Sequence, residues 1–296
     1  MYKSIKPYLI LFAGVFALST SAIWVKLAQA PSAVIAFYRL LLAALILLPF
    51  LLCSRKCRDE LRGLSGSRML QITAAGFFLA LHYVLWFESL RFTSTASSTV
   101  IVCLQPLFSL AIERFVAKKK VHPLALIGCV VALTGCVVIG LGDFRISGQS
   151  LLGDVLAFVA AGVIAVYYFV GENVRKEMSA LTYSTAAYLI SAAMLLVYSL
   201  LRGDPLGGFD RGTWLCFAGI AVVATIGGQF IFNLLLKNLP ASAVTMGILG
   251  EPIGTCILAA LILHEGMSPR QLIGFAVIML GMVIFFLRPS GPRQES

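Results

Sequence analysis

Apolar stretches of about 20 residues follow one another along almost the whole chain, and this feature leaves few folds open. One such stretch, as a helix, crosses a hydrocarbon core about 30 Å thick. Charged residues make up only 12% of the chain, whereas soluble domains usually contain about a quarter. The sequence therefore predicts an all-α integral membrane protein. Ten transmembrane helices are expected, at residues 8–27, 33–52, 69–90, 94–117, 122–141, 151–171, 181–201, 212–236, 241–263 and 269–288.

The fourth and ninth of these spans are copies of each other. Residues 95–117 and 241–263 align without gaps at an offset of 146, and in both a polar residue followed by proline interrupts the apolar run halfway. The same register continues downstream, so that nine of the 39 positions from Thr99 to Val137 are identical in the two copies. Matched prolines and glycines are harder to obtain by chance than matched aliphatic residues. We infer an internal duplication.

Each copy contains five spans, at 8–141 and 151–288, with short tails at 1–7 and 289–296. Because five is an odd number, the second copy enters the membrane from the opposite side. The sequence therefore predicts two inverted five-helix repeats, the architecture of many secondary transporters. The N-terminal 30 residues share some features with a signal peptide. The first apolar run is long for that role and has a counterpart in the second copy, so we expect a membrane helix there.

Basic residues are distributed unevenly between the two sides of the membrane. Segments on one side, including both termini, carry 16 Lys and Arg, and those on the other side carry 6. The positive-inside rule then predicts an inner or plasma membrane protein with both termini in the cytoplasm. Basic clusters such as Arg55–Arg58 and Lys118–Lys120 are also compatible with nucleic acid or anionic lipid. We interpret them as orientation signals and expect no nucleic-acid partner.

This pattern resembles the EamA type of the drug/metabolite transporter superfamily. The resemblance rests on the two repeats, on Gln105-Pro106 and Glu251-Pro252 in the fourth helix of each, and on Pro123 and Pro269 at the starts of the next helices. It implies ten helices and the transport of small metabolites or drugs, often by export. In one respect the sequence departs from the family, which usually has an acidic residue after both fourth helices. His264-Glu265 fits this pattern, whereas the first copy has Lys118-Lys119.

Glu251 is the first candidate for the functional site, because it lies near the middle of its span. Pro252 has no N–H and frees a backbone carbonyl one turn earlier, and Gly250 and Gly254 permit a kink and close helix packing. A carboxyl beside a free carbonyl suits a cation, an ammonium group or a proton. The structural alternative is a protonated glutamate at a kink. Gln105-Pro106 is the neutral counterpart, with Pro106 as its kink residue.

Arg39 and Glu88 are two further ionisable residues inside spans, where such groups usually face a partner or a cavity. We expect them to form an ion pair near the outer side, either as a fixed link between helices or as an anion site or gate. Glu113 and Glu172, by contrast, lie close to the inner ends of their spans and are expected to snorkel into water.

A polar and aromatic stripe on the third span is the last candidate. His82 and Trp86 stand one turn apart with Tyr83 beside them, which suits a cavity wall, although Trp86 could equally anchor the helix at the interface. Tyr168 in the sixth span is a further wall candidate. His82 has no second ligand at metal spacing, so no metal site is expected.

The sequence predicts a secondary transporter that moves a small, amino acid-like or drug-like metabolite by alternating access, with export as its direction. No phosphate-binding loop, GxSxG motif or aspartate cluster occurs, so we expect neither enzymatic activity nor a cofactor, and coupling to a proton gradient is the expected energy source. An integral membrane enzyme acting on lipid and a passive channel remain alternatives. The partners are the bilayer and a small-molecule substrate. A homodimer is compatible with the sequence, which carries no feature that indicates one.

Overall fold

The computed structural model describes residues 6–93, 95–140, 148–262 and 268–287, which contain helices and no strand. The predicted tails, the loop around Arg145 and His264-Glu265 lie wholly or largely outside these residues. The helices follow in the order α1 Lys6–Ser19, α2 Ser21–Leu27, α3 Ser32–Cys53, α4 Arg55–Arg62, α5 Gly66–Phe92, α6 Thr95–Val102, α7 Gln105–Phe115, α8 Pro123–Gly140, α9 Gly148–Val174, α10 Ala180–Arg202, α11 Arg211–Gly219, the π-helix η1 Ile220–Phe230, α12 Ile231–Leu235, α13 Ala241–Ile248, α14 Glu251–Ile262 and α15 Pro269–Phe286.

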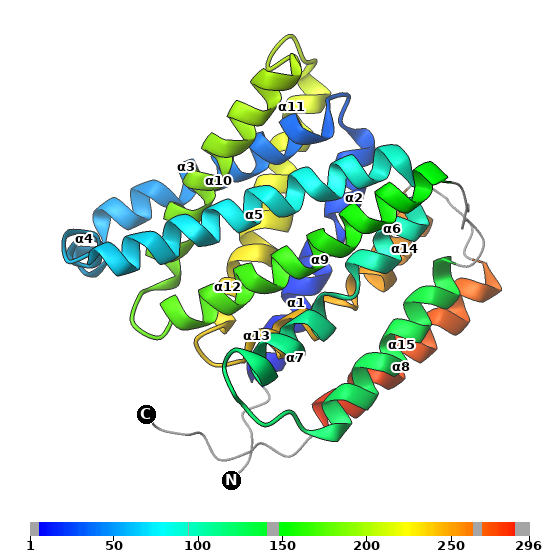
Figure 1. Ribbon diagram of the computed structural model, residues 1–296. Coiled ribbons are helices and arrows are strands. Elements are labelled where there is room, and N and C mark those ends of the chain that lie inside the picture. The colour runs from blue at the N-terminus through cyan, green and yellow to red at the C-terminus, as the bar shows by residue number, and fades with distance from the viewer. Residues whose placement is uncertain (1–5, 94, 141–147, 263–267, 288–296) are drawn as a thin grey trace.

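Several consecutive helices join end to end into single membrane spans (Figure 1). Thus α1 and α2 form the first span, α6 and α7 the fourth, α11 to α12 the eighth, and α13 and α14 the ninth. Within the described residues nine spans have the length and hydropathy to cross a membrane, and α8 is a slightly shorter apolar helix. The expected membrane-spanning helices are therefore present, with ends within a few residues of the predicted bounds.

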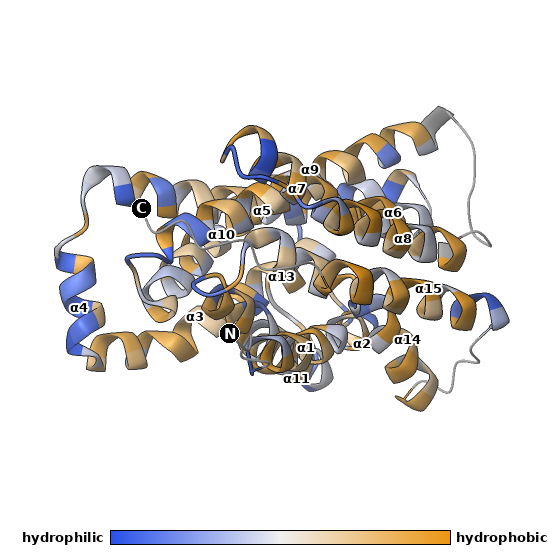
Figure 2. Cartoon of the chain, turned by 90° about the horizontal axis from the view of Figure 1, so that it is seen from below, coloured by the Kyte–Doolittle hydropathy of each residue, from blue (hydrophilic) through white to orange (hydrophobic). Residues whose placement is uncertain are grey.

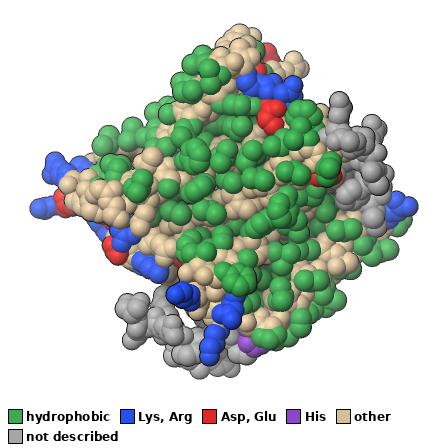
Figure 3. All heavy atoms as spheres, in the orientation of Figure 1, with side chains coloured by type: hydrophobic (Ala, Val, Ile, Leu, Met, Phe, Trp, Pro, Cys, Tyr) green, Lys and Arg blue, Asp and Glu red, His purple; other side chains and the backbone are tan. Residues whose placement is uncertain are grey.

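The outer surface of the bundle is that of a membrane protein. A broad apolar face runs across the spans, and the charged side chains that can be seen lie at its margins (Figure 3). Hydrophilic residues gather at the helix ends and on α4, which lies apart from the apolar helices (Figure 2). Sequence reasoning treated α4 as part of a connection. Glu60 on this short helix accepts hydrogen bonds from the backbone N–H of Ser179 (3.0 Å) and from its hydroxyl (2.7 Å), and so fixes α4 to the start of α10.

The closest helix packing lies between α8 and α15, which run side by side along one edge of the bundle (Figure 1). A Cβ on Gly128 would lie 2.6 Å from the carbonyl oxygen of Gly281, and one on Gly274 would lie 2.8 Å from that of Gly135. At the offset of 146, Gly128 corresponds to Gly274 and Gly135 corresponds to Gly281. The two contacts are therefore copies of each other with the partners exchanged. This reciprocity is what a two-fold axis between inverted copies requires, and glycine permits the close backbone approach.

The other helix pairs obey the same symmetry. The second span α3 packs on the seventh, α10, and α7 packs on α13. The third span α5 packs on α9, and its symmetry mate is the contact of η1 with α1. Each pair maps onto itself or onto another observed pair when the copies are exchanged. The all-α fold with two inverted five-helix repeats is confirmed.

Candidate functional site

Arg39 lies in the middle of the bundle and is only 5% exposed. Its Nε donates a hydrogen bond to the hydroxyl of Thr225 on η1 (3.2 Å), and its Nη1 donates to the hydroxyl of Ser21 (3.5 Å). The guanidinium carbon lies 5.2 Å from the centre of the Tyr83 ring, in reach of a cation–π interaction. Its Nη2 has no hydrogen-bond partner among the described residues. One edge of this buried cation therefore remains available.

The predicted pairing of Arg39 with Glu88 is wrong. Glu88 instead binds Arg91 (2.8 Å) and Arg202 (2.5 Å), and accepts a hydrogen bond from Tyr198. Counting residues from the span ends gave the depth of both groups but not the side of the helix on which each lies. Glu88 faces the partly exposed end of α10, whereas Arg39 faces η1 and the start of α2.

Glu251 begins α14, directly after the break that separates it from α13. Its backbone carbonyl accepts a hydrogen bond from Ser19 (3.1 Å), which ties the break to α1. The carboxyl group forms no hydrogen bond with any described residue. Protein surrounds the carboxyl, and the residue as a whole keeps part of its surface accessible.

Arg39 and Glu251 face the same region of the bundle. They interact electrostatically, but within the described part of the chain no nitrogen of Arg39 comes within the 4.0 Å of an ion pair with Glu251. Tyr83 lies within electrostatic range of both groups, and Tyr168 within range of Glu251. The structure thus brings four of the predicted site residues together: Glu251, Arg39, Tyr83 and Tyr168.

His82 lies on the same helix as Tyr83 but is turned toward α9. The Nδ1 of His82 bonds the carbonyl oxygen of Ala160 (3.0 Å), and the His82 ring stacks over Trp86 with 6.3 Å between ring centroids. His82 therefore connects α5 to α9. The indole N–H of Trp86 is buried and has no partner among the described residues.

A buried polar network that includes Tyr168 was largely missed by sequence reasoning. Asn233 donates to Tyr167 (2.8 Å) and Ser184 (3.0 Å), and Gln229 donates to Tyr168 (3.2 Å). Tyr167, Gln229 and Asn233 could be noticed as polar residues within spans, but nothing in the sequence joined them. The missed residues are Thr225, Ser184 and Tyr188, whose hydroxyl accepts a hydrogen bond from Asn233 (3.4 Å).

Gln105 occupies the position in the first copy that Glu251 holds in the second. It begins α7 after the same kind of break, and it is 7% exposed. The two broken spans meet nearby, where Thr245 donates a hydrogen bond to Ser109 (3.2 Å). The first copy therefore repeats the helix break without supplying a second charge.

Two glutamates at one end of the bundle, which were expected in water, are buried. Glu172 accepts from the backbone N–H of Ala241 (2.8 Å), and Glu113 accepts from that of Ser242 (3.1 Å). Glu113 is 6% and Glu172 is 7% exposed, and Lys119 pairs with Glu172 at 2.6 Å. Two carboxylates from α7 and α9 thus cap the N-terminus of α13, where the helix dipole favours negative charge. The expectation of snorkelling is wrong, because the backbone of α13 offers buried donors that the sequence does not reveal.

Arg175 is 4% exposed and donates to the carbonyl oxygen of Asn233 (2.9 Å). Burial lowers the pKa of Arg175 from its ordinary value, because it disfavours the charged form. Across the described ranges, no three His, Cys, Asp or Glu side chains are grouped so that they could hold a metal ion.

Comparisons with known proteins agree with this architecture. The model of the EamA-like transporter family matches residues 5–141 and again residues 151–287. The uncharacterized transporter YwfM of Bacillus subtilis (strain 168) is 28% identical over 224 residues, which cover 75% of this chain and 73% of YwfM. Human solute carrier family 35 member E4 is 25% identical over 254 residues, which cover 83% of this chain and 70% of that protein.

A solved crystal structure superposes with a TM-score of 0.77 at 17% identity, covering 96% of this chain and 98% of the other, which is a likeness of fold. The family model matches both halves of the chain, as the repeat predicted. The chain therefore belongs to the EamA-like transporter family, in the drug/metabolite transporter superfamily, and is a multi-pass membrane transporter.

Proposed function

We propose that this protein is a secondary transporter that exports a small zwitterionic metabolite, such as an amino acid, in exchange for protons. One observation carries the proposal. Arg39, a buried cation, and Glu251, an acid that can hold or release a proton, interact electrostatically without forming an ion pair. A charge inside the bundle is costly unless an opposite charge balances it, so a site that holds a cation and an acid apart is suited to a ligand that supplies both counter-charges.

A zwitterion fits this arrangement at each end. Its carboxylate would accept hydrogen bonds from the open Nη2 edge of Arg39, since guanidinium groups bind carboxylates in a fork geometry. Its ammonium group would bind the carboxyl of Glu251, which has no hydrogen bond to any described residue. Tyr83, whose ring centre lies 5.2 Å from the guanidinium carbon of Arg39, offers an aromatic wall for the substrate side chain, and Tyr168 lies within electrostatic range of Glu251.

Transport is coupled to protons because the carboxyl of Glu251 binds either a proton or the ammonium group of the substrate. The carboxyl of Glu251 can hold a proton or an ammonium group, but not both at once. Binding of substrate from one side would release the proton, and binding of a proton from the other side would release substrate. An inward proton gradient then drives export.

Alternating access requires the inner end of the bundle to open. We propose that the contacts of Glu113 and Glu172 with the N-terminus of α13 form the inner closure, and that they break in the inward-facing state. By the positive-inside rule this end faces the cytoplasm. Because the two copies are inverted, opening one end by rocking the copies against each other closes the other.

The function can be tested by counterflow in proteoliposomes. Vesicles containing purified protein are loaded with one unlabelled amino acid at a time, and entry of the same labelled compound is measured. We expect at least one zwitterionic amino acid to give counterflow that Arg39→Gln abolishes, while Glu88→Gln does not. Counterflow by carboxylic acids without an amino group, with no activity toward any amino acid, would contradict the proposal.

A further inference from the structure

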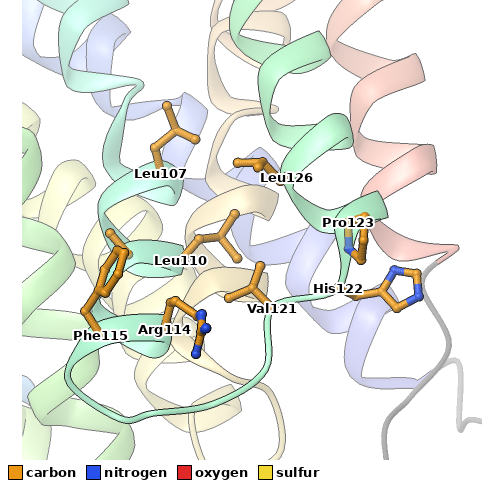
Figure 4. A pocket seen from close by; sticks show the side chains of 9 residues that line it. Leu107, Leu110, Arg114, Phe115, Val121, His122, Pro123 and Leu126 are labelled. Carbon is orange, nitrogen blue, oxygen red and sulfur yellow. The ribbon is translucent and has the colours of Figure 1, made fainter.

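A hollow lies at the predicted cytoplasmic end of the molecule, away from Arg39 and Glu251. It has a volume of about 430 Å³ and opens between α7 and the start of α8 (Figure 4). In Figure 4 the side chains of Leu110, Val121 and Leu126 point toward one another across it, with Arg114 below Leu110. The full lining is Leu107, Leu110, Ala111, Arg114, Phe115, Val121, His122, Pro123 and Leu126. We call this hollow the α7–α8 groove.

The groove exists because α8 is held away from α7. The close glycine contacts bind α8 to α15, while α7 packs mainly on α9 and α13. In Figure 1 the pair of α8 and α15 stands beside the rest of the bundle. The gap that results faces the membrane, since Phe115 is 79% and Leu126 is 49% exposed at its sides. A lipid acyl chain is the natural filler for an apolar gap in that environment.

Positive charge gathers at the inner mouth of the groove. Arg114 is exposed and has no hydrogen bond or ion pair with any described residue. Lys118 and Lys120 follow in the loop that joins α7 to α8, and both are exposed. Lys119 is already engaged by Glu172. The three other cations are therefore available to a ligand, at a depth where lipid phosphates lie.

We propose that the α7–α8 groove binds one anionic glycerophospholipid of the inner leaflet. An acyl chain occupies the space between Leu110, Val121 and Leu126. The phosphate group accepts hydrogen bonds from the guanidinium of Arg114, whose fork geometry suits phosphate oxygens. Lys118 and Lys120 select a headgroup with net negative charge, as basic groups between membrane helices do on the cytoplasmic side.

The second copy of the repeat provides an internal comparison. At the offset of 146, Ala260 stands in place of Arg114, His264 in place of Lys118 and Gly266 in place of Lys120. The inversion places this counterpart near the other face of the membrane. The cations therefore belong to one copy alone, on the side where anionic lipid raises the negative surface potential.

The proposal can be tested by native mass spectrometry of the full-length protein purified with mixed phosphatidylglycerol and phosphatidylcholine. The wild type is expected to retain one phosphatidylglycerol in preference to phosphatidylcholine. Arg114→Gln, alone and with Lys118→Gln and Lys120→Gln, should weaken this binding by about fivefold for each basic residue removed. Ala111→Phe, which fills the groove without changing charge, should also displace the lipid.

Arg55→Gln is the matched control, because Arg55 is exposed on α4 and lies outside the groove. It should leave binding unchanged. An equal loss with Arg55→Gln and Arg114→Gln, or no loss with Ala111→Phe, would show a general surface attraction and overturn the proposal. Photo-crosslinking of the wild type with a phosphatidylglycerol that carries a reactive acyl chain gives an independent reading. Labelling of peptides from α7 and α8 is expected, and labelling confined to other helices would also overturn it.

Discussion

The two broken spans of this transporter are built alike and equipped differently. In both copies an eight-residue helix, α6 or α13, ends three residues before a polar residue that is followed by proline. In the first copy that residue is Gln105, which is neutral and buried. In the second it is Glu251, which is ionisable and keeps accessible surface near Arg39. The two copies share the helix break, and the proposed chemistry differs between them where Gln105 is exchanged for Glu251.

Two symmetry-related helix pairs also differ, because the helices of one pair are regular and those of the other are irregular. The contact of α5 with α9 joins two unbroken helices of 27 residues each. Its symmetry mate joins the first span, which is interrupted at Thr20, to a span containing the π-helix η1. Ser21 follows that interruption and Thr225 lies in η1, and both bind Arg39. Irregular helices of this kind often mark functional sites, and here they position the buried cation.

The largest expected difference between the copies is in transport. Glu251→Gln removes the ionisable group but keeps its size, and should lower proton-driven transport by about 100-fold, or about 3 kcal/mol at 1.4 kcal/mol per tenfold. Gln105→Leu should lower it by about fivefold, because it removes a neutral polar group and no charge. Initial rates in proteoliposomes with an imposed pH gradient give both values. Similar losses for the two variants would mean that the copies contribute equally.

A double-mutant cycle sharpens the comparison at the level of stability. Arg39→Gln and Glu251→Gln should be coupled by about 1 kcal/mol or more, because each change leaves the other charge buried. Arg39→Gln and Glu88→Gln should be additive within about 0.5 kcal/mol, since these residues have separate partners. Thermal unfolding of the purified variants measures both couplings. Coupling of Arg39 to Glu88 alone would place the charged site elsewhere.

The symmetric part of the molecule should respond symmetrically. A Cβ on Gly128 would lie 2.5 Å from the backbone nitrogen of Phe285, and one on Gly274 would lie 2.4 Å from the side chain of Ile139. Gly128→Ala and Gly274→Ala should therefore each destabilise the protein by about 1–3 kcal/mol through overpacking. Gly162→Ala is the control, because its Cβ would lie 3.4 Å from the side chain of Phe108, an ordinary van der Waals distance. A large effect in one copy only would argue against equivalent packing.

The smallest effect is expected at Glu88. Its pairs with Arg91 and Arg202 are partly exposed, with side-chain exposures of 22% for Glu88, 56% for Arg91 and 33% for Arg202. Such pairs contribute about 0–1 kcal/mol. Glu88→Gln should accordingly leave the counterflow rate close to that of the wild type and change the melting temperature little. A strong loss of counterflow would return Glu88 to the transport site.

The sequence predicted the features that depend on counting along the chain. Span positions follow from run length, and the inverted repeat follows from the offset that pairs Pro106 with Pro252. The sequence did not predict which side of its helix a residue occupies, and therefore which neighbours it contacts. Arg39 was paired with Glu88 because both are ionisable residues toward the outer side of their spans, although they face different neighbours. Glu113 and Glu172 were assigned to water because the helix N-terminus that they cap is formed by a distant segment. The π-helix η1 left no signal, since its residues are as apolar as those of an ordinary span.

In the proposed mechanism, one substrate molecule displaces one proton from Glu251 while it also binds Arg39. The most direct measurement is proton release by purified protein in weakly buffered solution, followed with a pH indicator as the substrate found by counterflow is added. We expect the wild type to release protons until substrate binding saturates, and Glu251→Gln to release none. Equal release from both proteins, or binding by the wild type without any release, would contradict it.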